Sequence, residues 1–304
     1  MIDTQLSRYG LEANKYGTLS PAAKVHFVGP SSANWYGEFV GAYGPDVDGG
    51  NRAFATLTAA IADSNVVASR GDFLIVLPGY TQTMTAAGTV TVSKAGLTIL
   101  GVGEGNLRPT ISYSTSTAAS FDVTAANVAI DNLIFTMTGI DALTAGINVS
   151  AAGVTFRNCR IVNASASAQA TLCLLTTAVA DRFKFVNSEV TGTTDAGTTA
   201  AIRLVGGDSI VIENSTFFGA YGAGNGAIEN ITTACTNLKL LRNFINNATA
   251  ASTKAITAIA GTTGMFSENK MQILSLTAPI TAAGASWVGG NYYSNVIGTA
   301  GTLI

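Results

Sequence analysis

The chain has 304 residues, of which 11% are charged and 47% hydrophobic, and its formal net charge at pH 7 is −2. No Lys/Arg-rich stretch is present that could neutralise several phosphates, and no apolar run approaches the ~20 residues of a membrane span. We therefore expect neither a nucleic-acid partner nor a membrane location. The opening MIDTQLSRYG lacks a basic segment followed by an apolar one, so we also expect no signal peptide.

Residues 1–50 are rich in aromatic residues but show no hydrophobic period. Such a segment is too irregular to build its own core, yet too aromatic for a plain disordered tail. We predict an extended N-terminal arm for docking and assembly, whose aromatic side chains anchor in pockets of a partner. The alternative is that the arm folds back on its own domain. The expected anchors are Tyr9, Tyr16, Phe27, Trp35, Tyr36, Phe39 and Tyr43.

Residues 51–304 form the second predicted unit, which begins with a short helix at about 51–64. Phe54, Leu57 and Ile61 share one helical face there. A helix laid across the end of a stack of strands covers their apolar core, so we interpret it as a cap. The glycine-rich GVGEG at 101–105 is followed by a strand pattern, whereas a phosphate-binding loop requires a helix at that place.

From residue 127 onward a short phrase recurs, in which two apolar residues alternate with variable ones before an asparagine. The alternation predicts strands, and the spacing of 22 to 29 residues predicts a solenoid whose coils bury each other's apolar faces. A second apolar column after the asparagines predicts further strands in each coil. The asparagines are Asn132, Asn158, Asn187, Asn214, Asn243, Asn269 and Asn291.

We predict that these seven asparagines face inward at turns and stack as a hydrogen-bonded ladder along the axis. Glycosylation of matches such as Asn214-Ser-Thr is the alternative. Asparagine tolerates the left-handed backbone region, and a ladder satisfies buried polar groups. The residues just before the ladder point outward, so Asp131 should pair with Arg157, and Arg242 with Glu213 and Glu268.

The sequence offers few residues for catalysis or metal binding. Cys159, Cys173 and Cys235 form no CxxC pair and fit buried thiols, and His26 is the single histidine. The closest group of carboxylates is Asp181, Asp208 and Glu213, for which turn capping is the alternative to catalysis. We expect no catalytic residue, no cofactor and no metal.

The chain resembles the pectin-lyase-like family of right-handed parallel β-helices over about residues 51–304. The resemblance rests on the cap, GDFLIVLPGYTQT at 71–83, AGLTILGVGEG at 95–105 and the Asn-bearing coils. It implies an all-β fold, but this architecture carries lyases, hydrolases, tailspikes and inert virion proteins alike. Within it, the Ser/Thr/Ala-rich coils and the arm are most similar to bacteriophage virion proteins.

The function we expect from this resemblance is structural and not enzymatic. The chain would be a capsid decoration or cement protein that stabilises a bacteriophage particle through its N-terminal arm. Its partners would be other virion proteins, above all the major capsid protein, in a homotrimer located in the virion after assembly in the host cytoplasm. The alternative is a tailspike or fibre module that binds, or binds and cleaves, a host surface glycan; a free polysaccharide lyase and a bacterial adhesin are further alternatives.

Overall fold

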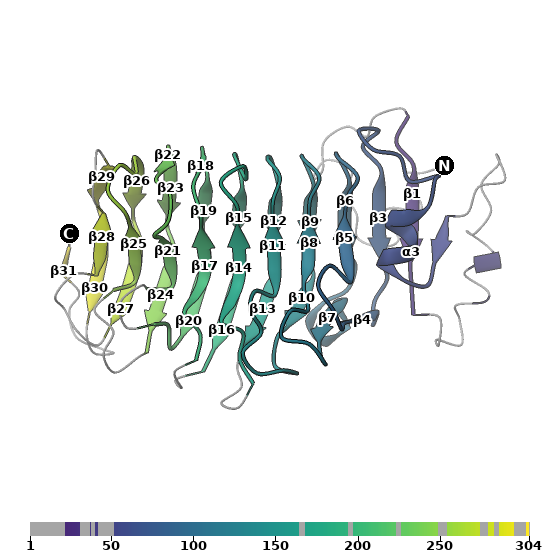
Figure 1. Ribbon diagram of the computed structural model, residues 1–304, viewed down its shortest axis with the longest axis horizontal. Helices are drawn as coiled ribbons and strands as arrows, with labels where there is room; N and C mark the ends of the chain where they lie inside the picture. The colour runs from purple at the N-terminus through teal and green to yellow at the C-terminus, as the bar shows by residue number, and fades with distance from the viewer. Residues whose placement is uncertain are drawn as a thin grey trace.

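The computed structural model describes residues 22–30, 37, 40–41, 52–163, 168–193, 197–222, 226–248, 254–273, 279–282, 286–294 and 302–303. In these residues the chain winds into an elongated stack of coils, with the strands lying side by side along the axis (Figure 1). Each coil passes in turn through three sheets, which we number I, II and III, and successive coils pair in parallel. The predicted right-handed parallel β-helix is confirmed.

Sheet I has eleven strands in the described part of the chain. In spatial order they are β2 (Ala53–Phe54), β1 (Val25–Val28), β3 (Phe73–Val76), β6 (Thr98–Gly101), β9 (Ala129–Asp131), β12 (Thr155–Arg157), β15 (Lys184–Val186), β19 (Val211–Glu213), β23 (Leu238–Leu241), β26 (Gly264–Ser267) and β29 (Ser286–Gly289).

Sheets II and III complete the coils. Sheet II contains β4 (Thr81–Met84), β7 (Thr110–Tyr113), β10 (Ile134–Thr136), β13 (Arg160–Asn163), β16 (Glu189–Gly192), β20 (Thr216–Gly219), β24 (Phe244–Asn247), β27 (Lys270–Ile273), β30 (Tyr292–Ser294) and the antiparallel β31 (Thr302–Leu303). Sheet III contains β5 (Val90–Val92), β8 (Phe121–Val123), β11 (Ile147–Val149), β14 (Leu172–Thr176), β17 (Ala200–Leu204), β21 (Ile228–Asn230), β25 (Ile256–Ala258) and β28 (Ile280–Ala282). The short strands β18 (Gly207–Asp208) and β22 (Cys235–Thr236) pair at the turns that lead into sheet I.

The core is one continuous column of inward side chains, because every second residue of a strand points to the same side. In sheet I the inward row of the central coils is Ile130, Phe156, Phe185, Ile212 and Leu240, all fully buried. Aromatic rings from neighbouring coils pack inside this column. All three cysteines are buried and free, and burial raises the pKa of the Cys159 and Cys173 thiols to about 12.

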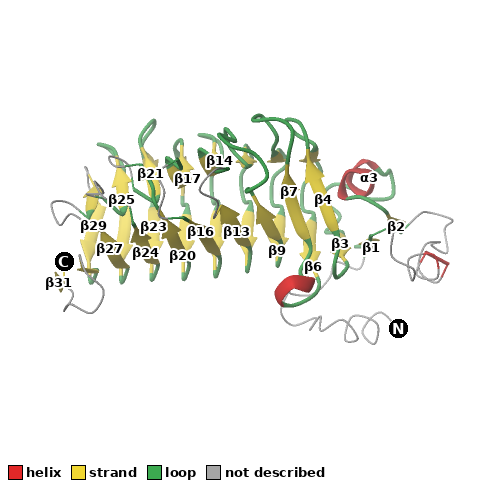
Figure 2. Cartoon of the chain, turned by 90° about the horizontal axis from the view of Figure 1, so that it is seen from below, coloured by secondary structure: helices red, strands yellow, loops and turns green. Residues whose placement is uncertain are grey.

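A short helix, α3 (Leu57–Ala62), covers the N-terminal end of the stack, as predicted for the cap (Figure 2). Its N-terminus is held by Thr56, whose hydroxyl accepts a hydrogen bond from the Ala59 N–H. The Leu57 N–H donates to Tyr80 Oη and Gln82 Oε1, both at 3.0 Å. The helix buries Leu57, Ala60 and Ile61, while Phe54 lies in β2. A 3-10 turn, η2 (Gly105–Leu107), follows β6 where the GVGEG segment ends.

Part of the segment predicted as an arm belongs to the solenoid. Strand β1 lies between β2 and β3 in sheet I and pairs in parallel with both. Phe27 packs against an apolar cluster on the outer face of sheet I. The other expected anchors, Tyr9, Tyr16, Trp35, Tyr36, Phe39 and Tyr43, lie outside the described residues.

The asparagine ladder differs from its prediction, because the seven residues occupy two neighbouring positions of the turn between sheets I and II. Asn132, Asn158, Asn187 and Asn214 hold the left-handed turn position itself, with φ between 50° and 60°. In the last three coils Arg242, Glu268 and Gly290 take that position.

The buried ladder consists of the residues that follow the left-handed position. Asn243 Nδ2 donates to Asn269 Oδ1 at 3.0 Å, and Asn269 Nδ2 donates to Asn291 Oδ1 at 2.8 Å. Ser188 and Ser215 continue this column in the earlier coils, where each hydroxyl oxygen accepts the backbone N–H of the coil before it. The inward asparagine ladder therefore has three members and not seven.

No helix in the described residues is long and apolar enough to cross a membrane.

Candidate functional site

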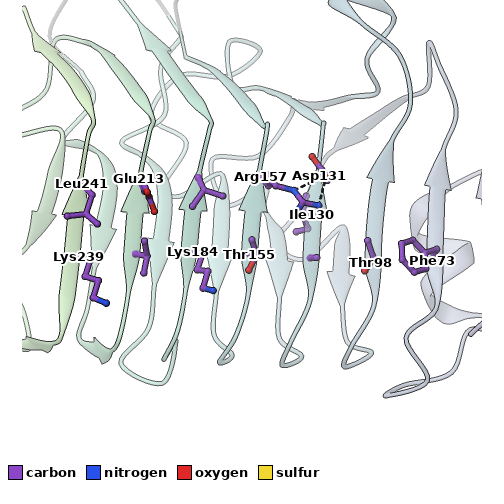
Figure 3. Close-up of a pocket in the computed structure, with 13 residues that line it drawn as sticks. Phe73, Thr98, Ile130, Asp131, Thr155, Arg157, Lys184, Glu213, Lys239 and Leu241 are labelled. Carbon is purple, nitrogen blue, oxygen red and sulfur yellow. Dashed lines mark hydrogen bonds and ion pairs between the residues drawn. The ribbon is translucent and has the colours of Figure 1, made fainter. Parts of the chain in front are cut away.

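The described residues form a groove along the outer face of sheet I, with a volume of about 670 Å³. It crosses the strands from β3 to β23 and so runs parallel to the axis of the solenoid (Figure 3). Its lining residues are Phe73, Thr98, Ala129, Ile130, Asp131, Thr155, Arg157, Lys184, Val186, Val211, Glu213, Lys239 and Leu241.

Two outward rows of side chains form this groove, because each short strand has two residues that point away from the core. Thr155, Lys184, Val211 and Lys239 are in register in one row. In the other row Asp131, Arg157, Val186 and Glu213 follow one another in register. Figure 3 shows the labelled members of both rows on consecutive strands.

At the N-terminal end of the groove, residues of the N-terminal segment cover one of the two rows. Ile75 and Leu100, which precede Asp131 in register, are buried members of an apolar cluster. Phe27 and Val40 pack against that cluster. The row becomes charged at Asp131, which is itself buried, and open to solvent from Arg157 onward.

Both carboxylates of the groove are engaged by arginines. Asp131 is 1% exposed and its Oδ2 accepts hydrogen bonds from Arg157 Nε and Nη2 at 3.0 and 2.8 Å, while its Oδ1 accepts from Asn158 Nδ2 at 2.9 Å. Glu213 pairs with Arg242, which also lies 3.8 Å from Glu268. The two predicted cross-coil charge pairings are confirmed.

Two lysines of the groove have no such partner. Lys184 and Lys239 are exposed, and neither forms an ion pair or a side-chain hydrogen bond within the described residues. They lie in the same row with Val211 between them, so they are two coils, or roughly 10 Å, apart. The groove therefore presents two uncompensated positive charges along the axis.

This arrangement is suited to an anionic chain molecule and poorly suited to hydrolysis by paired carboxylates. Asp131 and Glu213 are three coils apart, about 14 Å, which exceeds the separation of up to ~9.5 Å that glycoside hydrolysis uses. Among the described residues, no three His, Cys, Asp or Glu side chains gather closely enough to hold a metal ion.

The carboxylates singled out from the sequence do not form a site. The Asp208 N–H donates to Asp181 Oδ1 at 2.8 Å, and Asp208 itself accepts hydrogen bonds from Thr236, Asn237 and Ser209. These donors lower the pKa of Asp208. The geometry is that of turn capping. Glu213 lies in sheet I, apart from this turn.

Sequence reasoning missed the lysines of the groove. Lys184 and Lys239 stand in the phrases DRFKF and NLKLL at an outward strand position, which is an ordinary place for a lysine. One signal could have identified them: each lysine directly precedes an inward residue, Lys184 before Phe185 and Lys239 before Leu240. Without the register, nothing marked them as members of one row.

Comparison with solved structures finds proteins whose fold is similar to that of this chain. The chain resembles a solved rhamnogalacturonan lyase with a TM-score of 0.54 and 13% identity, over 82% of this chain and 68% of that one. It also matches an alginate lyase from Paenibacillus sp. str. FPU-7 with a TM-score of 0.44 and 18% identity, over 79% of this chain and 95% of that one. No protein-family model matches the sequence, and no curated protein matches it.

These neighbours require a correction. From the sequence we expected the chain not to be an enzyme, and the likeness to a solved rhamnogalacturonan lyase contradicts that expectation. At this identity the likeness establishes the fold alone. Lyase chemistry therefore belongs among the functions to be tested.

Proposed function

We propose that this protein binds an anionic polysaccharide along the groove of sheet I. The observation that carries the proposal is the pair of unpartnered lysines, Lys184 and Lys239, in a groove whose carboxylates are already paired. A glycan parallel to the axis would place an anionic group against each lysine. Trp287, which is 57% exposed, continues the lysine row two coils further and offers an aromatic face for a sugar ring.

Single charge removals test the binding site. Lys184→Gln and Lys239→Gln should each weaken binding of polygalacturonate, alginate or hyaluronan oligosaccharides by about tenfold, because each removes one charge-assisted contact. The control Arg182→Gln removes an exposed positive charge at a turn outside the groove lining and should change the affinity little. Isothermal titration at two salt concentrations measures both effects. Equal affinity of the lysine variants and the wild type for every oligosaccharide that binds would refute the proposal, as would the absence of binding to all three polymers.

Eliminative cleavage of the bound chain is a second candidate function, which the position of Lys184 one coil from Arg157 favours. In this reaction a base removes the proton on the carbon next to the sugar carboxylate, the C–H electron pair forms a double bond, and the C–O bond to the leaving sugar breaks. Lys184 would accept this proton and then donate it to the oxygen of the leaving sugar, while Arg157 would balance charge on the carboxylate. Incubation with the same polymers should yield unsaturated sugars that Lys184→Gln does not form.

The biological setting remains a proposal. A tailspike or fibre module would use this groove to hold a host surface glycan, which agrees with an elongated body that carries its binding surface along its length. Capsid decoration, the homotrimer, the capsid-protein partner and the virion location stay predictions. The copy number of the chain in a purified particle separates the two settings, since hundreds of copies indicate decoration and a few trimers indicate a tail.

A further inference from the structure

A second surface with side chains suited to carbohydrate lies on sheet II at the C-terminal end. Phe244, Lys270 and Tyr292 occupy the same outward position in β24, β27 and β30, in register across three successive coils. We call these three residues the aromatic row. Phe244 is 43% exposed and Tyr292 48% exposed, and Lys270 between them is exposed as well.

The aromatic row lines a shallow groove of about 290 Å³. Gln272 lies beside the row, and its Oε1 accepts a hydrogen bond from Asn246 Nδ2 at 2.8 Å. Lys270 forms no ion pair with any described residue. The groove thus combines two exposed aromatic side chains with an uncompensated positive charge and an amide.

We propose that the aromatic row is a second polysaccharide-binding site, separate from the groove of sheet I. Sugar rings pack their C–H faces on Phe244 and Tyr292, and Lys270 contacts a carboxylate of the sugar between them. The two aromatic residues are two coils, or roughly 10 Å, apart, and a sugar in an extended chain advances by about one coil spacing. The inference rests on the proposed function for the choice of an anionic glycan as the ligand.

A glycan fits this surface better than a second copy of the chain does. Lysine is depleted from the centre of protein interfaces, whereas here Lys270 is central. The volume of the groove, about 290 Å³, is also close to the ~300 Å³ of the smallest ordinary small-ligand sites.

Four variants of the full chain separate the two sites. The row variant carries Phe244→Ala and Tyr292→Ala, the groove variant carries Lys184→Gln and Lys239→Gln, and a combined variant carries all four substitutions. Val179→Ala changes an apolar residue that is 61% exposed and lies in neither groove, so it is the matched control. Each variant is titrated with polygalacturonate, alginate and hyaluronan oligosaccharides, and its molar mass and thermal transition are measured.

We expect the groove variant to keep a weaker binding site, the row variant to lose one site per chain, and the combined variant to bind none of the oligosaccharides. Relative to the groove variant, removal of the two rings should weaken binding by at least about tenfold. The Val179→Ala protein should titrate like the wild type.

The outcomes keep the two proposals distinguishable. If the groove variant has no residual binding, the aromatic row is not a binding site while the function proposed for sheet I stands. If the groove variant titrates like the wild type and the row variant loses all binding, the sheet I proposal fails and the aromatic row stands. A wild type that binds none of the oligosaccharides contradicts both. If the row substitutions change the molar mass and leave the titration unaltered, the row is a contact between copies and the proposal is overturned.

Discussion

At the scale of single residues, His26 is the inward side chain with the least ordinary chemistry. It occupies the row that continues with Leu74 and Ile99, is fully buried, and neither ring nitrogen has a hydrogen-bond partner. Burial lowers its pKa below the usual 6.5, although the nearby carboxylate of Asp72, 3.8 Å from Nε2, acts in the opposite direction. Arg70 and Arg52 lower it further, and Asp63 raises it.

This histidine should make the stability of the fold depend on pH. Because its pKa is lower in the folded state than in the unfolded chain, the unfolded chain binds the extra proton as the pH falls below 6.5. The contribution of His26 to the free energy of unfolding should therefore be constant above that pH and should decrease between pH 6.5 and 5. Chemical denaturation at a series of pH values measures this decrease.

The control is His26→Leu, which matches Leu74 in the same row and should flatten the curve over that interval. The pKa of Asp72 is lowered because hydrogen bonds from Arg70 and from the Lys24 and Val67 N–H groups outweigh its burial, so its contribution is lost only at lower pH. An equal loss of stability in the two proteins between pH 6.5 and 5 would show that His26 is not the cause.

At the scale of elements, the turn between sheets I and II uses asparagine in two different ways. At Asn187 the side chain is exposed and the backbone is left-handed, with a φ of 50°. At Asn269 the side chain is fully buried, donates to the Leu240 carbonyl oxygen and Asn291 Oδ1, and accepts from Asn243. The first use exploits backbone tolerance, while the second satisfies buried polar groups.

Replacing asparagine by glycine should therefore have a small effect on stability in one coil and a large effect in another. Asn187→Gly should change the free energy of unfolding by less than about 1 kcal/mol, because glycine adopts the left-handed region freely. Asn269→Gly should cost about 3 kcal/mol or more, because buried partners on both sides lose their hydrogen bonds. Urea denaturation of the two variants compares these values directly, and equal costs would contradict the division of the asparagines into two groups.

The asparagine turns show what the sequence could not predict, which is the position of each asparagine within its turn. The alternation of apolar residues predicted the strands and the charge pair of Asp131 and Arg157, but it did not fix whether a coil has two strands or three. It also aligned Leu241 with Ile212, whereas Leu240 is the true partner of Ile212. Because Leu240 and Leu241 are both apolar, the sequence does not show which of them points inward. Choosing Leu241 placed Asn243 at the left-handed turn position, which Arg242 occupies, and Asn243 in fact follows it.

The candidate sites were less predictable than the fold for a related reason. A lysine or an aromatic residue at an outward strand position is ordinary in isolation, and it becomes part of a site only when the register aligns it with equivalents in other coils. Lys184 and Lys239 are 55 positions apart in the chain, and the coils between them differ in length. Because the coil lengths vary between 22 and 29 residues, a search for residues that recur at one fixed spacing does not find such rows.

At the scale of the whole molecule, the solenoid is a stack in which each coil contacts mainly its two neighbours. Stability then approximates a sum over coils and their interfaces, so one coil can be removed if the phase of the strands is kept. Lys184 and Val211 are register partners, which makes residues 185–211 one complete coil. Deleting them joins Lys184 to Ile212 and leaves inward and outward positions unchanged.

We expect this deletion of residues 185–211 to fold with β-rich circular dichroism and a cooperative thermal transition. Phe156 would then meet Ile212 in the core, and the column of buried polar side chains would pass from Cys159 to Ser215 as it now passes to Ser188. Deleting residues 186–211 instead is the control, because it places the inward residues Phe185 and Ile212 side by side and drives one apolar side chain toward solvent. That protein should aggregate or melt much earlier.

The in-phase deletion also tests whether the spacing of the lysines matters for binding. It brings Lys184 and Lys239 onto neighbouring coils, about 5 Å apart instead of roughly 10 Å, while the aromatic row on sheet II is unchanged. Two lysines at the shorter distance repel each other and no longer match anionic groups two sugars apart, so the affinity of the sheet I groove should fall by about tenfold. Titration of the deletion protein should then resemble that of the single variant Lys184→Gln. An unchanged affinity would mean that net charge, and not the two-coil spacing, governs recognition.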